Sequence, residues 1–195
     1  KVFPKLEINE QNINDYISEV SKKKNNISLE IGFGSGENLL NLINKSEKNR
    51  IFIGCEPYLN GMAMFLSKLH NSKLSNVRVI MDDARILFDV TPTSSISKLF
   101  LLFPDPWPKR RHADRRFINK NNIKVLKRII RSGGILHIAT DVDMYVKHVL
   151  ETFLDEDEFD EVSDHCLIYD RNKDGKLVLV FRSRTFSSMK DILCS

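Results

Sequence analysis

The sequence predicts an α/β fold whose mostly parallel sheet ends in an antiparallel hairpin. Short apolar segments of strand length alternate with segments of helical periodicity, as in repeated strand–helix–strand units. A polar turn at 172–175 separates two strand-like segments near the C-terminus and indicates the hairpin. A length of 195 residues is typical of one domain, so we expect a single domain over 1–195, with 1–26 as an N-terminal extension.

The apolar pattern places each element in turn. Buried parallel strands are apolar on both faces, and such segments lie at 28–31, 51–55, 77–81, 96–103 and 135–139. Helical spacing of apolar residues occurs at 13–20, 37–43, 59–69, 119–130 and 142–153. The hairpin strands are expected at 161–169 and 177–182. Gly133 and Gly134 follow the helix predicted over 119–130, and we expect them to end it.

Charge is distributed unevenly along the chain. The net charge is only +4, which says little about partners. Cations dominate 109–131, where Asp114 is the only acid, and acids dominate 151–164. This separation predicts one face that attracts polyanions and another that repels them.

The cysteines and the apolar segments exclude several classes of protein. Cys55, Cys166 and Cys194 lie far apart and form neither a CxxC pair nor a zinc-ligand spacing, so we expect no metal and a reduced, cytoplasmic protein. No apolar run approaches the roughly 18 residues of a membrane span, and we expect no membrane partner. No signal peptide is visible. The sequence begins at Lys1 rather than at methionine, which leaves room for an upstream segment.

Small or acidic residues follow each of the five parallel strands. Because ligands of such sheets bind at the carboxyl ends of the strands, we expect these residues to surround one site. They are Gly32, Gly34, Gly36, Glu56, Asp83, Ala84, Asp105 and Asp141. The alternative is that the glycines form only a tight turn and that Glu56 is a solvated surface acid.

The acids around the glycine loop indicate the charge of the ligand. Glu30 precedes the loop, and Glu37 stands where a dinucleotide-binding motif would have its third glycine. Both carboxylates would repel a pyrophosphate, whereas they would attract a ligand with a sulfonium and an ammonium group. The sequence therefore favours S-adenosylmethionine over NAD.

The segment 101–116 combines an acid, a flat aromatic and many cations. Asp105 lies between Pro104 and Pro106, whose rings stiffen the loop, and Trp107 follows. An acid beside an indole suits a purine, and the arginines that follow suit phosphates. Two alternatives stay open: Trp107 packs under the loop rather than stacking on a base, and the cations form a solvated helix start.

Five motifs occur in the order and at the spacing of one enzyme family. They are 29–36 (LEIGFGSG), 54–56 (GCE), 83–84 (DA), 103–112 (FPDPWPKRRH) and 139–141 (ATD). In these motifs the chain resembles the bacterial tRNA (guanine-N7-)-methyltransferases, which modify a guanine in the tRNA variable loop. The match spans roughly 28–190, and the proline–tryptophan–basic motif is highly specific.

The resemblance implies a Rossmann-like, S-adenosylmethionine-dependent methyltransferase with a seven-stranded sheet, S-adenosylhomocysteine as product and tRNA as partner, as a monomer or a homodimer. It implies Asp105 as the catalytic residue. The implied cofactor contacts are Glu30, Gly32, Gly34, Gly36, Glu56, Asp83, Ala84 and Asp105. The implied substrate contacts are Lys109, Asp141, Thr185 and Ser188. The implied RNA contacts are Arg110, Arg111, His112, Arg115 and Arg116.

The C-terminal motif departs from the family pattern, which is Thr-x-aromatic-Glu-x-Lys/Arg. Thr185 and Lys190 fit it, but Ser187 and Ser188 replace the aromatic and the glutamate. The missing carboxylate keeps two other functions open. One is a non-catalytic RNA-binding module with the methyltransferase fold, and the other is a methyltransferase for a different guanine-containing RNA.

Overall fold

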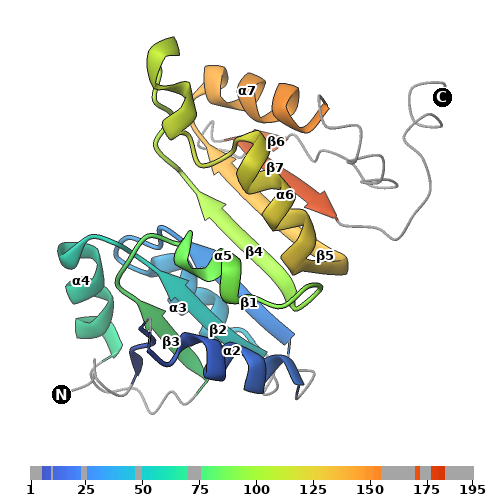
Figure 1. The fold of residues 1–195 in the computed structure, drawn as a ribbon. Helices are drawn as coiled ribbons and strands as arrows, with labels where there is room; N and C mark the ends of the chain where they lie inside the picture. The colour runs from blue at the N-terminus through green and yellow to red at the C-terminus, as the bar shows by residue number, and fades with distance from the viewer. Residues whose placement is uncertain are drawn as a thin grey trace.

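The structure, a computed structural model, describes residues 6–9, 11–22, 26–46, 50–69, 76–154, 170–171 and 177–182. Its centre is a twisted sheet (Figure 1) with the strand order β3-β2-β1-β4-β5-β7-β6. The strands are β1 (Asn26–Ile31), β2 (Arg50–Cys55), β3 (Val77–Ile80), β4 (Ile96–Leu102), β5 (Ile130–Thr140), β6 (Asp170–Arg171) and β7 (Leu177–Arg182). The first five pair in parallel, which confirms the predicted α/β class with a parallel sheet.

Helices cover both faces of the sheet. They are α2 (Ile13–Lys22), α3 (Glu37–Asn44), α4 (Leu59–Leu69), α5 (Ile86–Val90), α6 (Lys120–Ile129) and α7 (Asp143–Leu154), with a 3₁₀ helix η1 at Arg110–Arg115. On one face, α2, α5, α6 and α7 pack in one apolar cluster with β1, β4 and β5. On the other face, α3 and α4 pack with Phe52, Val77 and Val79. This two-sided packing explains why the central strands read as continuous apolar segments.

Two features of the fold differ from the sequence-based prediction. Helix α5 was not predicted, because five residues are too few to show helical periodicity. The expected role of the glycine pair is wrong: α6 ends at Ile129, and Ile130 is already extended at φ −75° and ψ 126°. Gly133 and Gly134 lie inside β5, where the register with β4 shifts. A Cβ on Gly134 would stand 2.7 Å from the carbonyl oxygen of Arg131, so the tight local bend explains the glycine.

The end of the chain is described only in part. β7 pairs antiparallel with β5, and β6 pairs antiparallel with β7 over two residues. The first strand of the predicted hairpin, at 161–169, lies outside the described residues. Among the helices that the structure describes, none has both the length and the apolar character that crossing a bilayer requires.

Candidate functional site

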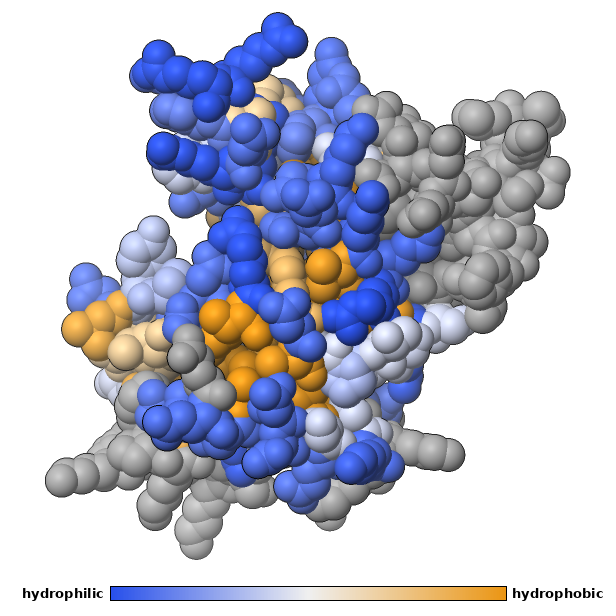
Figure 2. All heavy atoms as spheres, viewed as in Figure 1, coloured by the Kyte–Doolittle hydropathy of each residue, from blue (hydrophilic) through white to orange (hydrophobic). Residues whose placement is uncertain are grey.

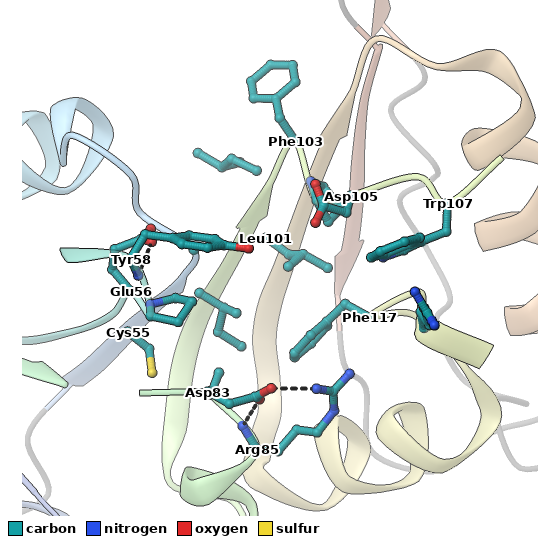
Figure 3. A pocket seen from close by; sticks show the side chains of 17 residues that line it. Cys55, Glu56, Tyr58, Asp83, Arg85, Leu101, Phe103, Asp105, Trp107 and Phe117 are labelled. Carbon is teal, nitrogen blue, oxygen red and sulfur yellow. Dashed lines mark hydrogen bonds and ion pairs between the residues drawn. The ribbon is translucent and has the colours of Figure 1, made fainter. Parts of the chain in front are cut away.

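A cleft of about 290 Å³ opens at the carboxyl edge of the sheet, between the tips of β1, β2, β3 and β4. Figure 3 shows its side chains, which come from segments far apart in the sequence. Five of the residues expected at a common site line it: Gly32, Glu56, Asp83, Ala84 and Asp105. The parallel topology therefore brings these strand-end residues together around a single cavity.

Glu56 is held rigidly at the tip of β2. Its side chain is 4% exposed, so it is not a solvated surface acid. One carboxylate oxygen accepts a hydrogen bond from the backbone N–H of Gly34 at 2.7 Å, and the other accepts from the N–H of Tyr58 at 2.9 Å. The carboxylate thereby fixes the glycine loop against the start of α4 and keeps a fixed negative charge in the wall of the cleft.

The glycine loop depends on backbone conformations that favour glycine. Gly32, Gly34 and Gly36 have φ angles of +69°, +54° and +73°. At Gly36 a Cβ would also stand 2.1 Å from the Phe65 ring, because α4 packs directly against the loop. Gly34 and Gly36 shape the loop but are not among the residues lining the cleft, which Gly32 alone of the three reaches.

Glu30 lies beneath the loop rather than in the cleft wall. Its side chain is 3% exposed, and one carboxylate oxygen accepts a hydrogen bond from Asn38 Nδ2 at 3.0 Å. Burial raises the pKa of Glu30 to about 7, and the hydrogen bond from Asn38 opposes this rise. Glu30 can therefore change its protonation state near neutral pH.

Asp83 forms the floor of the cleft together with Arg85. The backbone N–H and the guanidinium of Arg85 donate to the two carboxylate oxygens of Asp83, at 2.9 and 2.6 Å. The Arg85 guanidinium also lies 5.7 Å from the centre of the Phe117 ring. Asp82 instead accepts from the N–H of Asp83 at 2.6 Å and serves as a cap of the loop. Sequence analysis did not single out Arg85, because a lone arginine after a strand carries no distinctive pattern.

Asp105 stands on a strained loop after β4. Phe103 and Trp107, on either side of it, have positive φ angles of 52° and 40°, which are uncommon for residues with a Cβ. The N–H of Phe103 donates to the carbonyl of Ala139 on β5 at 2.7 Å, which anchors the strained segment to the sheet. The carboxylate of Asp105 is exposed and faces the cleft (Figure 3). Strain of this kind is typical of functional loops.

Trp107 is half-buried within the basic segment. The guanidinium of Arg115 lies 4.9 Å from its ring centre, and the His112 ring contacts it edge-on at 5.7 Å. Both Trp107 and Arg115 also line the cleft. One face of the indole therefore carries a cation while the residue borders the cavity, so the base-stacking and packing interpretations both remain compatible with its position.

One member of the predicted RNA-binding set has a different role. Arg116 is 7% exposed, and its guanidinium donates to the carbonyls of Pro106 and Trp107, each at 3.0 Å. It also contacts Met144 Sδ on α7 at 3.3 Å. The expected contact between Arg116 and RNA is therefore wrong: the side chain braces the loop of Asp105 from inside. In sequence, nothing distinguishes Arg116 from its neighbour Arg115.

The remaining predicted residues lie around the cleft. Lys109, Arg110, Arg111 and Asp141 are exposed and are not among its lining residues. His112 is half-buried and accepts from Arg111 Nε at 3.3 Å. Thr185 and Ser188 lie outside the described residues. Within the described part of the chain, no group of three His, Cys, Asp or Glu side chains could hold a metal ion.

Two aromatic residues at the cleft were missed from sequence. Tyr58 is 69% exposed and Phe103 is 47% exposed, and both line the cavity. Figure 3 shows the Tyr58 ring projecting across the cleft toward the side of Asp105. Both residues directly follow the tips of strands, β2 and β4, and that position was the available signal.

Comparison with known proteins places the chain in a family. A family model described as "Putative methyltransferase" matches residues 24–189. The chain is 49% identical over 125 residues to a tRNA (guanine-N(7)-)-methyltransferase of Ruegeria sp. (strain TM1040), covering 63% of this chain and 48% of the relative. It is 40% identical over 140 residues to one of Rhizobium johnstonii, covering 72% and 60%. The chain thus spans about half the length of the curated relatives it matches.

The fold is also shared with solved structures. An rRNA methylase of Streptococcus thermophilus superimposes with a TM-score of 0.61 at 15% identity, covering 91% of this chain and 99% of that chain. This likeness shows the Rossmann-like methyltransferase fold. Since the family model matches most of the sequence, the chain belongs to this methyltransferase family, that of the tRNA (guanine-N7-)-methyltransferases.

Proposed function

We propose that the protein transfers a methyl group from S-adenosylmethionine to N7 of a guanine in the tRNA variable loop. The observation that carries the proposal is the cleft in which Glu56, Asp83 and Asp105 meet beside a cationic loop. The names of the curated relatives support the same reaction. We further propose one domain over 1–195, with the seven-stranded sheet and its C-terminal hairpin as a unit, acting in the cytoplasm as a monomer or a homodimer.

The residues of the cleft fit a cationic cofactor. When bound, S-adenosylmethionine supplies an electrophilic methyl group on a sulfonium and leaves as S-adenosylhomocysteine. Glu56, Asp83 and Asp105 give the cleft wall a negative character that suits a sulfonium and an ammonium group. Gly32 and Ala84 leave room for a close approach to the backbone. Glu30, under the loop, adds a further negative charge when ionised.

Asp105 has a positioning and electrostatic role in this proposal. Guanine N7 carries a lone pair and no proton, so the reaction needs no general base. Orientation of N7 toward the methyl group supplies the rate, and such positioning is worth up to roughly 7–11 kcal/mol in favourable cases. The carboxylates of Asp105 and Asp141 accept hydrogen bonds from the N1 and N2 donors of guanine and stabilise the positive charge that develops on the base. Lys109 is proposed to bind substrate beside them, with Thr185 and Ser188.

The cationic residues beyond the cleft complete the proposed substrate site. Arg110, Arg111 and Arg115 are exposed, and His112 lies among them. They are proposed to bind phosphates next to the target guanine. Arg116 is not part of this set, since it is buried.

Mass spectrometry of nucleosides tests the function directly. Unmodified tRNA is incubated with protein and methyl donor and then digested, and we expect 7-methylguanosine. Asp105→Ala should lower the single-turnover rate strongly, by about 10²-fold or more, as loss of a charge-stabilising group does. Asp114→Ala, which removes an exposed acid from η1, serves as the control and should leave the rate unchanged. A full single-turnover rate in Asp105→Ala would refute the assigned role.

The replacement of the family aromatic–glutamate pair by Ser187 and Ser188 favours one second candidate, a non-catalytic RNA-binding module of the same fold. Calorimetric titration separates the two. A module that binds tRNA without transferring methyl groups would bind RNA in the titration and yield no 7-methylguanosine in the assay above. A methyltransferase for another guanine-containing RNA would modify that RNA and leave tRNA unmodified.

A further inference from the structure

Helix α6 presents a row of lysines to solvent on one face. Lys120, Lys124 and Lys127 stand at positions i, i+4 and i+7, so they share a side of the helix, and all three are exposed. The opposite side buries Ile123, Leu126 and Ile129 in the core. Figure 2, in the view of Figure 1, shows mostly hydrophilic side chains over the region of α6. We call Lys120, Lys124 and Lys127 the α6 lysine face.

The charges on this face work against the helix that carries them. The helix has no acidic residue, and Lys120 occupies its first turn, where the helix dipole favours acids. Lys120–Lys124 and Lys124–Lys127 are like-charge pairs at the spacings at which helix side chains meet. Packing of the apolar side and the cap at Asn119, which accepts from the N–H of Asn122 at 3.0 Å, hold the helix nonetheless. A bound polyanion would relieve the repulsion.

The α6 lysine face is joined rigidly to the loop at the cleft. Asn119 Nδ2 donates to the carbonyl of Arg116 at 2.9 Å, and Asn122 Nδ2 donates to the carbonyl of Phe117 at 2.7 Å. Phe117 lines the cleft, and Arg116 braces the loop of Asp105. The row therefore begins close to the cleft and runs away from it for about 10 Å, at 1.5 Å per residue. An RNA whose base enters the cleft has its backbone within reach of this row.

Neighbouring charges restrict the surface to this one row. Arg128, on the same helix, donates to the carbonyls of Phe88 and Thr91 and is occupied in the fold. The hollow between α6 and α7 is lined by Asp114 and Glu151 as well as by Lys120 and His148. These two acids disfavour a phosphate on the α7 side. The exposed row thus offers phosphates a path along α6 and away from α7.

We propose that the α6 lysine face binds backbone phosphates of the RNA whose guanine occupies the cleft, and so extends the contact surface beyond the basic segment of η1. This inference rests on the proposed function. It assigns Lys124 and Lys127 a part in affinity that is independent of base sequence and sensitive to salt, and no part in the chemistry.

Binding of unmodified tRNA as a function of salt tests the proposal. The double variant Lys124→Gln/Lys127→Gln is compared with Lys22→Gln/Lys45→Gln, which removes the same charge from exposed positions at the ends of α2 and α3. Each lost phosphate contact should reduce the slope of log K against log salt by about 0.7–0.9. Two lost contacts mean that, between 50 and 200 mM salt, the α6 variant loses roughly tenfold less affinity than the wild type. The control variant should keep the wild-type slope.

A short ligand separates this surface from the cleft. A trinucleotide centred on guanine fills the cleft but does not extend along α6, so its affinity should be the same in the wild type and the α6 variant. Equal salt slopes for tRNA in the wild type and the α6 variant would overturn the proposal, as would an equal slope loss in the control. Methyl transfer is scored separately: a protein that forms no 7-methylguanosine but shows the slope change refutes the proposed function and retains this surface.

Discussion

Burial of Glu30 under the glycine loop makes a single carboxyl group pH-sensitive. Its pKa rises from 4.5 to about 7 because desolvation disfavours the charged form. A carboxyl group whose pKa is higher in the folded than in the unfolded state binds its proton more tightly when folded. Its contribution to stability is therefore complete below pH 4.5 and is lost as the pH rises through 7.

We expect this contribution to appear as a difference between the wild type and Glu30→Gln. Between pH 4.5 and 8 the free energy of unfolding of the cofactor-free wild type should fall by roughly 3 kcal/mol relative to the variant, whose amide does not ionise. Urea unfolding at several pH values measures it. Parallel pH profiles of the two proteins would show that Glu30 keeps an ordinary pKa.

The two adjacent arginines at the end of η1 show how residues of one type differ in role. Arg115 is exposed beside Trp107, whereas Arg116 is buried and donates to two carbonyls. Only the packing of α7 and of the loop after β4 creates this difference. No pattern in the sequence contains it, which is why Arg116 was predicted to bind RNA.

At the scale of elements, Arg116 joins the loop of Asp105 to α7 through its contact with Met144. Arg116→Gln should lower the free energy of unfolding by about 2–4 kcal/mol, because hydrogen bonds from a charged donor are lost and two buried carbonyls lose a partner. Thermal unfolding measures the loss.

Arg115→Gln provides the matched control for this change and should alter stability by less than about 0.5 kcal/mol, as surface substitutions do. The methyl-transfer rate of Arg116→Gln should also fall at a temperature where the variant is fully folded, since the loop loses its brace. If Arg116→Gln melts like Arg115→Gln, the buried contacts do not stabilise the loop.

The elements of the sheet could be predicted because each is encoded locally. Strands buried on both faces need apolar side chains throughout, so β1 to β5 stand out from the polar segments between them. Elements decided by tertiary contacts could not be predicted. The end of α6 depends on the pairing of Ile130 with Ile96, and α5 depends on its packing against α2 and α6. The candidate site follows the same division: acids at strand tips are visible in sequence, whereas the pairing of Arg85 with Asp83 is not.

At the scale of the whole molecule, the cleft joins two parts of the sheet. The tips of β1, β2 and β3 contribute Gly32, Glu56 and Asp83, and the tip of β4 contributes Asp105. Arg85 connects the two sides, since it pairs with Asp83 and lies over Phe117, which directly follows the braced Arg116. A ligand that contacts both sides would therefore stabilise the entire fold rather than one loop.

Thermal unfolding with added ligands tests this coupling and the charge of the cleft together. At a concentration 100 times its Kd, a ligand that binds only the folded state adds about 2.7 kcal/mol to the free energy of unfolding, which for a chain of this size raises Tm by roughly 5–10 °C. We expect S-adenosylmethionine and S-adenosylhomocysteine to produce such a rise and NAD to produce none, because the acids of the cleft repel its pyrophosphate. Glu56→Gln should diminish the rise, since the amide removes a negative charge and places an N–H donor against the N–H of Gly34 or Tyr58. An equal rise with NAD would contradict the assignment of the acids to a cationic ligand, and an undiminished rise in Glu56→Gln would remove Glu56 from the cofactor site.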